Sequence, residues 1–230
     1  MSGVTLVVLA KAPEPGRVKT RLCPPVTPGQ AADLAAAALL DTLDAARAVP
    51  GATVLVALTG DLGPAARSGE LAAALRGTVV VAQRGDGLGE RIAAAHADAA
   101  ARAPGLPSLQ VGMDTPQLDG PLLAAAAARL HREGGPDAVL GPASDGGWWA
   151  LGLRDPRHAA LVAGVPTSRA DTGERTLHAL RAGGLRVELL AELRDVDTAA
   201  DAVAVAAAAP HSRLAAAVAA LPSLNTVVRC

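Results

Sequence analysis

Short runs of β-branched and aliphatic residues alternate along the chain with longer stretches rich in alanine and leucine. The short runs have the length and composition of strands, and the longer stretches have the composition of helices. This alternation favours an α/β fold with a mostly parallel, mixed sheet and helices on both faces. The predicted strands are Thr5–Ala10, Thr53–Leu58, Thr78–Gln83, Leu109–Met113, Ala138–Leu140, Trp148–Leu153 and Arg186–Leu190.

Helix starts are marked by side chains that cap free backbone N–H groups. Thr27 is followed three residues later by Gln30, which predicts a capped helix that runs to about residue 48. Asp171 and Glu174 have the same spacing and predict a capping box for a later helix. The alanine-rich stretch from Ala199 onward predicts helix in two pieces, broken at proline 210.

Length and composition favour one domain over residues 1–230 with a core built from small aliphatic side chains. Half of the residues are apolar, but the chain has no Phe and no Tyr, and its only aromatic residues are Trp148 and Trp149. Adjacent side chains on a strand face opposite ways. We therefore predict that one tryptophan lies in the core and that the other lines a cleft.

Several classes of protein are disfavoured by composition. The formal net charge of −1 and the scarcity of aromatics argue against nucleic-acid binding. Cys23 and Cys230 form no spaced framework, no signal peptide is recognisable, and no segment is apolar enough to span a bilayer, so we expect a reduced, cytoplasmic protein. The five histidines have no nucleophile nearby in sequence, and we interpret them as surface or cap residues. They are His96, His131, His158, His178 and His211.

Both lysines of the chain lie in one loop directly after the first predicted strand. This loop holds Lys11, Arg17, Lys19 and Arg21, and Gly16 allows close approach of its backbone to a ligand. In open α/β sheets, ligands bind at the carboxyl ends of the strands. Four cations within eleven residues suit a polyphosphate. A solvated basic turn is the alternative interpretation of this segment.

A glycine-rich loop follows the third predicted strand. It runs from Gln83 to Arg91, and Gly87 and Gly89 open the next helix. Free backbone N–H groups at a helix start are able to receive an anion or the polar edge of a base. A flexible turn would have a similar sequence, so this motif is weak when taken alone.

Three aspartates stand at strand ends where oxygen ligands are useful. Asp114 follows the fourth predicted strand and is suited to a hard cation such as Mg²⁺, although it also suits an Asx-turn or a helix cap. Asp195 and Asp197 point to the same side of an extended segment, so both are able to face one ion. The alternative is that Asp197 or Thr198 caps the helix that follows.

A second glycine-rich turn precedes the strand that carries both tryptophans. Asp145 stands before Gly146 and Gly147, where little side-chain bulk shields its carboxylate. We interpret Asp145 as an acceptor-binding group or general base. With Trp148 and Trp149, these residues form the predicted acceptor pocket.

Four motifs in the same order resemble a known family. The radical SAM/selenodomain-associated transferases, a family of candidate glycosyltransferases with the GT-A (nucleotide-diphospho-sugar transferase) fold, are similar to this chain over nearly its whole length. A more distant resemblance is to 2-phospholactate and phosphoenolpyruvate guanylyltransferases. The motifs are Lys-Ala-Pro…Gly-Arg-Val-Lys-Thr-Arg-Leu, Gly-Met-Asp-Thr-Pro-Gln-Leu, Gly-Pro-Ala-Ser-Asp-Gly-Gly-Trp-Trp-Ala-Leu-Gly and Asp-Val-Asp-Thr.

The resemblance implies roles for particular residues. It implies that Lys11, Lys19 and Arg21 hold the nucleotide phosphates and that Gln83 to Arg91 flank the nucleobase or ribose. The residues that it implies for a Mg²⁺ or Mn²⁺ ion are Asp114, Asp195 and Asp197. Relatives often have Ile-Pro-Trp-Ser where this chain has Val-Pro-Thr-Ser at residues 165–168. Because of this difference, the resemblance does not define the acceptor pocket.

The implied function is a nucleotide-dependent, divalent-metal-assisted transferase. Glycosyl transfer from a nucleotide-sugar donor is the leading hypothesis, with Lys19, Asp114 and Asp145 as the candidate catalytic residues. Nucleotidyl transfer with release of pyrophosphate is the alternative, because one fold hosts both reactions. A non-catalytic nucleotide-binding module is a third. The sequence identifies neither the small-molecule acceptor nor the oligomeric state.

Overall fold

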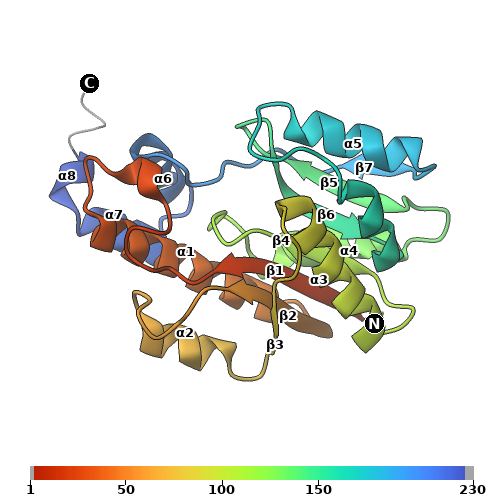
Figure 1. The fold of residues 1–230 in the computed structure, drawn as a ribbon, viewed down its shortest axis with the longest axis horizontal. Helices are drawn as coiled ribbons and strands as arrows, with labels where there is room; N and C mark the ends of the chain where they lie inside the picture. Colours follow the sequence, from red (N-terminus) through yellow and green to blue (C-terminus); the bar gives the residue numbers. More distant parts are fainter. Residues whose placement is uncertain (1–2, 226–230) are drawn as a thin grey trace.

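The computed structural model describes residues 3–225, which contain one seven-stranded sheet (Figure 1). The strand order is β3-β2-β1-β4-β6-β5-β7, and β6 runs antiparallel to both neighbours while the other pairs are parallel. All the predicted strands are confirmed. Their bounds are β1 Val4–Lys11, β2 Ala52–Thr59, β3 Val79–Ala82, β4 Ser108–Val111, β5 Ala138–Pro142, β6 Trp148–Leu153 and β7 Val187–Leu189.

Helices cover both faces of the sheet, as predicted. Helices α1, α2 and α4 pack on one face, and α3, α5 and the 3-10 helix η2 pack on the other. Helices α6, α7 and α8 pack against α1 at one end of the molecule (Figure 1). The bounds are η1 Thr20–Leu22, α1 Pro28–Arg47, α2 Ser68–Leu75, α3 Leu88–Arg102, α4 Gly120–His131, η2 Pro156–Val162, α5 Thr172–Ala182, α6 Ala199–Ala208, α7 Arg213–Ala219 and α8 Pro222–Asn225.

The interior strand β1 contributes side chains to the hydrophobic cores on both faces of the sheet. Leu6 and Val8 pack with the helices of one face, whereas Val7 packs with Ala95 and Ala99 of α3 on the other face. This follows from the two-residue period of a strand. Small alanine side chains at these contacts let the helices approach the sheet without large aromatic residues.

The order of the strands places a cleft beside the end of β1. The chain continues from β1 to β2 and β3 on one side, and then crosses to β4 on the other side of β1. The loops that follow β1 and β4 therefore diverge, which is where open α/β sheets bind ligands. The segment after β7 also reaches this point, because Val196 N donates to Asp114 O at 2.9 Å. Figure 1 shows this segment crossing the molecule toward α6.

One predicted capping box forms and the other does not. Thr27 Oγ1 accepts from Gln30 N at 3.3 Å, and Gln30 Oε1 accepts from Thr27 N at 2.8 Å, so the start of α1 is confirmed. Asp171 precedes α5 but its side chain makes no capping bond. Its carboxylate accepts from Arg169 Nε at 3.0 Å and from Arg175 Nε at 2.7 Å instead, because two guanidinium groups compete for it. The two-piece helix after residue 199 is confirmed as α6 and α7.

His96 is a correction to the sequence analysis, because it is fully buried between α3 and the sheet. Its Nδ1 lies 2.7 Å from Ser108 Oγ on β4. Burial lowers the pKa of His96 to about 4, although the Gln110 side chain partly offsets this, so the imidazole is neutral near pH 7. The error arose because this histidine lies on the face of α3 that packs against the sheet.

Two further expectations concern cysteine and the membrane. Cys23 is a free thiol, and Cys230 lies outside the described residues. Within residues 3–225, no helix combines the length and the hydropathy that a membrane crossing requires.

Candidate functional site

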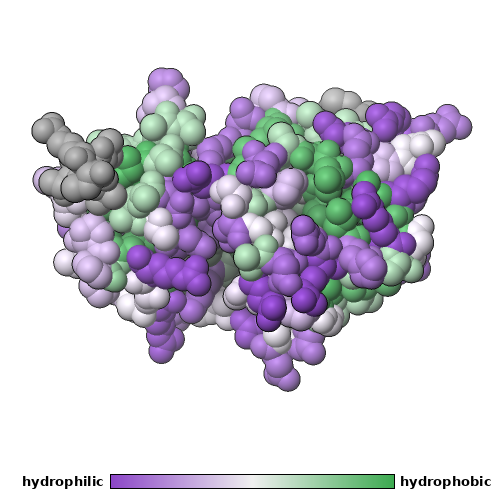
Figure 2. Space-filling view, turned by 90° about the horizontal axis from the view of Figure 1, so that it is seen from above, coloured by the Kyte–Doolittle hydropathy of each residue, from purple (hydrophilic) through white to green (hydrophobic). Residues whose placement is uncertain are grey.

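A cavity of about 780 Å³ lies at the carboxyl ends of β1 and β4. Its volume is within the range of small-molecule sites. Figure 2 shows this side of the molecule hollowed between the C-terminal helices and the rest of the chain, with mostly hydrophilic residues along the hollow. The lining includes Leu9, Lys11, Arg17, Lys19, Arg21, Leu88, Ile92, Gln110, Gly112, Met113, Asp114, Asp145, Gly147, Trp148, Thr167, Ser168, Arg169, Ala170, Thr172, Asp195 and Asp197.

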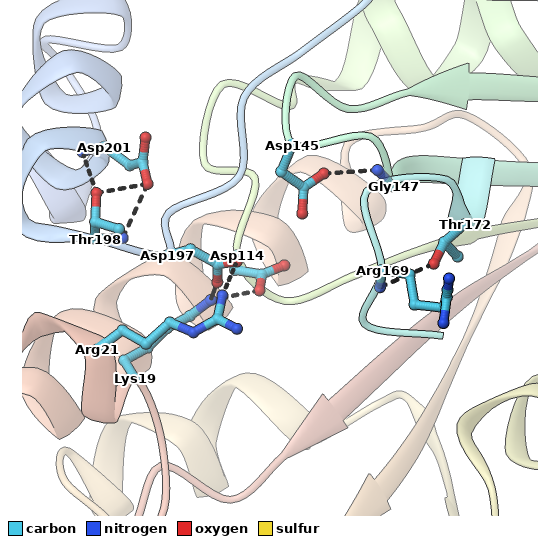
Figure 3. Close-up of polar contacts among 10 residues, drawn as sticks. All are labelled: Lys19, Arg21, Asp114, Asp145, Gly147, Arg169, Thr172, Asp197, Thr198 and Asp201. Atoms are coloured by element: carbon cyan, nitrogen blue, oxygen red, sulfur yellow. Dashed lines mark hydrogen bonds and ion pairs between the residues drawn. The ribbon is translucent and has the colours of Figure 1, made fainter. Parts of the chain in front are cut away.

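One side of the cavity, which we term the charged wall, consists of Lys19, Arg21, Asp114, Asp195 and Asp197. Lys19 Nζ donates to Asp114 Oδ2 at 2.6 Å and to Asp197 Oδ1 at 3.0 Å (Figure 3). Arg21 Nη1 lies 3.6 Å from Asp197 Oδ2. The fold thus brings together groups that the sequence places in three separate segments.

The two lysines of the loop have different partners. Lys11 is exposed, and its Nζ donates to Arg17 O at 2.8 Å, so it closes the loop on itself. Gly16 allows this turn with a φ of 77°. Lys19 also has a left-handed backbone, with a φ of 47°, and its side chain is only 12% exposed. A non-glycine residue in this conformation is strained, and such strain often accompanies function.

The surroundings of Lys19 and Asp195 raise the pKa of both groups. Burial lowers the pKa of Lys19, but the charges of Asp114 and Asp197 outweigh burial, so the net pKa is raised above its ordinary value. Burial and the charge of Asp114 raise the pKa of Asp195 to about 7, against a hydrogen bond from Thr115 and the charge of Lys19. The charged wall therefore already contains a permanent cation among its carboxylates.

The chemistry of the charged wall suits a divalent ion only in part. Within residues 3–225, no group of three or more His, Cys, Asp or Glu side chains is arranged to hold a metal ion. Asp195 accepts from Thr115, while Asp114 and Asp197 converge on the Lys19 ammonium. These two carboxylates have the donor type that Mg²⁺ prefers, and Mg²⁺ commonly takes its other ligands from water and substrate phosphate.

The opposite side, which we term the loop wall, consists of Asp145, Gly147, Trp148, Arg169 and Thr172. Its contacts are mostly to the backbone. Asp145 Oδ1 accepts from Gly147 N at 2.8 Å, and Arg169 N donates to Thr172 Oγ1 at 3.2 Å (Figure 3). Asp145 is exposed and lines the cavity, so its carboxylate is accessible to a ligand.

The two tryptophans separate as predicted. Trp149 is 1% exposed, and its Nε1 donates to Ala191 O at 2.9 Å. Trp148 is half-buried and lines the cavity, and its Nε1 donates to Thr176 Oγ1 at 3.2 Å. Trp148 thus belongs to the site, whereas Trp149 belongs to the core beside it.

Gly146 supports the loop wall without lining the cavity. Its φ is 87°, and a Cβ atom there would lie 1.9 Å from Ala170 O. Only glycine therefore lets the loop of residues 166–171 pack so closely on the turn after β5. Gly173 N also donates to Gly146 O at 2.8 Å, which fixes the start of α5 to this turn.

The loop after β3 contributes less than the sequence suggested. Gln83 Nε2 donates to Ala10 O and Ala57 O, so its side chain ties neighbouring strands together. Arg91 Nε donates to a backbone carbonyl of its own loop. Neither side chain lines the cavity, and the same holds for Gly16, Gly87, Gly89, Gly146 and Trp149. From this loop and the following turn, Leu88 and Ile92 line the cavity.

Sequence reasoning missed several residues that line the cavity or support its lining residues. Gln110 is 2% exposed and lines the cavity. Its position as a polar residue between leucine and valine in a strand could have identified it from the sequence. Thr115, which follows Asp114 directly, is fully buried and donates to Asp195. Arg169, Ala170 and Thr172 line the cavity as well, next to Thr167 and Ser168 of the segment that the resemblance had connected with the acceptor pocket.

A second, smaller cavity of about 430 Å³ lies between α1 and α7. Its two arginines already have carboxylate partners, because Arg67 pairs with Asp33 and Arg213 pairs with Asp44. The larger cavity, with its convergent charges at strand ends, is therefore the candidate functional site.

The fold and the family follow from comparison with known proteins. The fold is that of the nucleotide-diphospho-sugar transferases, which confirms the predicted fold class. Residues 42–169 match the family described as "Uncharacterized protein conserved in bacteria (DUF2064)", and the chain belongs to this family. No protein with curated annotation matches the chain in sequence.

Three solved structures illustrate the likeness. A candidate nucleotide-diphospho-sugar transferase from Desulfovibrio desulfuricans G20 is 29% identical, with 97% of both chains covered and a TM-score of 0.82. A CMP:2-keto-3-deoxy-manno-octonic acid synthetase in complex with CTP is 14% identical over 90% of this chain and 98% of its own, with a TM-score of 0.54. A nucleotidyl transferase from Methanothermobacter is 16% identical over 88% of this chain and 95% of its own, with a TM-score of 0.50.

Proposed function

We propose that this protein is a nucleotide-dependent transferase whose charged wall binds the phosphates of a nucleotide donor. The observation that carries the proposal is the convergence of Lys19, Asp114 and Asp197 at the ends of β1 and β4. The likeness to the Desulfovibrio protein, over 97% of both chains, supports a nucleotide-sugar as the donor. Glycosyl transfer is accordingly the leading reaction.

Phosphate binding would draw on the cations of the first loop. Lys19 and Arg21 line the cavity beside the aspartates, and Lys11 and Arg17 line it from the same loop. Each charge-assisted hydrogen bond of this kind contributes on the order of 1.5–3 kcal/mol. Together these groups would stabilise the charge that grows on a phosphate leaving group as its bond to the sugar breaks.

A divalent ion fits this proposal when substrate phosphates complete its ligands. Asp114 and Asp197 would hold Mg²⁺ or Mn²⁺, and Asp195 lies beside them on the same wall. Such an ion supplies Lewis-acid stabilisation of phosphate oxygens. The protein's part is to present these carboxylates at a fixed position and to balance their charge with Lys19.

The acceptor would bind along the loop wall. Trp148 offers an apolar indole surface to the cavity, and Asp145 offers a carboxylate held by the N–H of Gly147. In this proposal Asp145 orients the acceptor hydroxyl and accepts its proton as that oxygen attacks the donor. The acceptor is a small molecule with at least one hydroxyl group.

Nucleotidyl transfer is the second candidate, because the same four cations suit a triphosphate. The two reactions differ in the bond that breaks, so analysis of the products separates them. The purified protein is incubated with Mg²⁺, a panel of nucleotide-sugars or nucleoside triphosphates, and a mixture of small hydroxyl-containing acceptors. Release of nucleoside diphosphate indicates glycosyl transfer, and release of pyrophosphate indicates nucleotidyl transfer.

Binding without turnover of any member of the panel would favour a non-catalytic nucleotide-binding module. An Asp114→Ala variant provides the control for this experiment. Any turnover that the variant retains at full rate arises from a contaminant or from another site.

A further inference from the structure

The Lys19 ammonium lies between the two carboxylates that are proposed to hold a divalent ion. It donates to Asp114 at 2.6 Å and to Asp197 at 3.0 Å, and its side chain is only 12% exposed. The three residues come from the loop after β1, the end of β4 and the segment after β7. The fold, and not a local turn, therefore assembles this ammonium–carboxylate cluster.

A free divalent ion and this ammonium compete for the same two carboxylates, because Lys19 already holds one oxygen of Asp114 and one of Asp197. Two cations within a few ångströms repel each other strongly where water is partly excluded. A divalent ion that bound Asp114 and Asp197 would lie close to the Lys19 ammonium, and the two cations would repel each other unless Lys19 moved away.

A phosphate group offers Lys19 a better partner. Lysine is a compact charge on a flexible stem, so its ammonium moves readily between neighbouring anions. The backbone of Lys19 has a φ of 47°, which L-residues disfavour. The ion pairs of Lys19 with Asp114 and Asp197 offset the cost of this strained conformation. Arg21 and Arg17 line the same cavity and would hold the incoming phosphate close to Lys19.

We propose that Lys19 occupies the cation position of the charged wall until a nucleotide arrives, and that the divalent ion enters only with the nucleotide's phosphates. This inference rests on the proposed function for the identity of the phosphate ligand. The exclusion of free metal from Asp114 and Asp197 by Lys19 needs no nucleotide and is a property of the protein alone. The order of binding is therefore built into the charged wall.

The direct test measures binding of Mn²⁺ without nucleotide, by electron paramagnetic resonance of the free ion. The wild type is compared with Lys19→Met, which keeps an unbranched side chain one atom shorter and removes the charge. Lys11→Met is the matched control, because Lys11 carries the same charge in the same loop but donates to Arg17 O. We expect Lys19→Met to bind Mn²⁺ on the order of tenfold more tightly than the wild type and Lys11→Met to match the wild type. Equal affinities of all three proteins would overturn the proposal.

A second measurement needs no change at residue 19. The chain has only two lysines, so protein labelled with ¹³C at lysine Cε gives two resonances, which the Lys11→Met variant assigns. We expect Mg²⁺ alone to leave the Lys19 resonance in place and Mg²⁺ with inorganic pyrophosphate to shift it. The proposal is wrong if Mg²⁺ alone shifts this resonance as far, or if pyrophosphate with Mg²⁺ leaves it unmoved.

These results are distinguishable from failure of the proposed function. If the wild type binds nucleotides but Lys19→Met gains no affinity for Mn²⁺, the exclusion by Lys19 is wrong and the transferase proposal stands. If Lys19→Met gains affinity but no nucleotide binds the wild type, the exclusion stands and the transferase proposal fails.

Discussion

The two walls of the cavity are held in place by different kinds of interaction. The charged wall holds its side chains in place through ion pairs among ionised groups, as Lys19 does with Asp114 and Asp197. The turn and loop of the loop wall are held by contacts of backbone N–H groups, as Gly147 N donates to Asp145 and Arg169 N donates to Thr172, while the Arg169 side chain pairs separately with Asp171. Ion pairs rearrange when another charge arrives, whereas backbone contacts depend on close packing. We therefore expect ligand charge to reorganise the first wall and steric change to disrupt the second.

The largest effect is expected where the loop wall packs most tightly. Gly146→Ala would place a Cβ atom 1.9 Å from Ala170 O at a φ of 87°, so the loop of residues 166–171 must move. We expect a loss of roughly 3 kcal/mol in the free energy of unfolding, measured by urea denaturation. Gly164→Ala is the control, because its Cβ would meet nothing within 4 Å and should change stability by about 0.5 kcal/mol or less. Similar losses in both variants would contradict this account of the loop wall.

The next effect is on stability at low pH and concerns His96, whose buried side chain lies beside Gln110 of the cavity lining. The pKa of His96 is about 4 in the folded protein and about 6.5 when the chain is unfolded. The folded pKa is the lower one, so this contribution to stability is present above pH 6.5 and is lost as the pH falls through 4. The loss at pH 4 is about 3 kcal/mol, from 1.36 kcal/mol for each pKa unit.

The contribution of His96 is separated from the titration of the carboxylates by comparing the wild type with His96→Gln. The free energy of unfolding of both proteins is measured by urea denaturation at pH 7 and at pH 4. The variant should lose less stability than the wild type between the two pH values. An equal loss would show that the buried imidazole does not resist protonation.

An effect on binding is expected at the charged wall. Lys19→Ala should weaken nucleotide affinity in Mg²⁺ by about 10- to 100-fold, since one charge-assisted contact of about 1.5–3 kcal/mol is removed. Arg169→Ala removes a cation from the loop wall, where Nε already pairs with Asp171, and should change affinity by about threefold or less. Calorimetric titration of both variants with nucleotide measures these affinities. A loss of affinity in Arg169→Ala as large as that in Lys19→Ala would contradict the distinction between the two walls.

The smallest effect is expected at Trp148. Trp148→Phe keeps an aromatic ring but loses the bond to Thr176, which should cost about 1 kcal/mol of stability and leave nucleotide affinity unchanged. Thermal unfolding measures the cost. The remaining fluorescence comes from buried Trp149 alone, so its emission should lie at a shorter wavelength than that of the wild type. An unchanged emission maximum would show that Trp148 is as buried as Trp149.

The sequence predicted elements better than contacts between them. Strands and the start of α1 follow from local periodicity and from the spacing of Thr27 and Gln30, so they were correct. The opposite faces of Trp148 and Trp149 follow from the strand period and were also correct. The burial of His96 depends on which face of α3 meets β4, which local patterns do not determine.

Within the site, the strand-end argument placed the residues but not their partners. Lys19, Asp114 and Asp197 were expected near one another because they follow predicted strand ends on one edge of the sheet. That Lys19 pairs with both aspartates depends on side-chain packing across segments far apart in the chain. The capping box at Asp171 failed for the same reason, because Arg169 and Arg175 take its carboxylate.

The central claim is that the charged wall binds the phosphates of a nucleotide together with a divalent ion. Isothermal titration of the wild type and of Asp114→Ala with nucleoside diphosphates and triphosphates, each in Mg²⁺, tests it most directly. We predict saturable binding of at least one nucleotide to the wild type and its loss in a folded Asp114→Ala variant. Absence of binding to the folded wild type, or equal affinity in both proteins, would contradict the account.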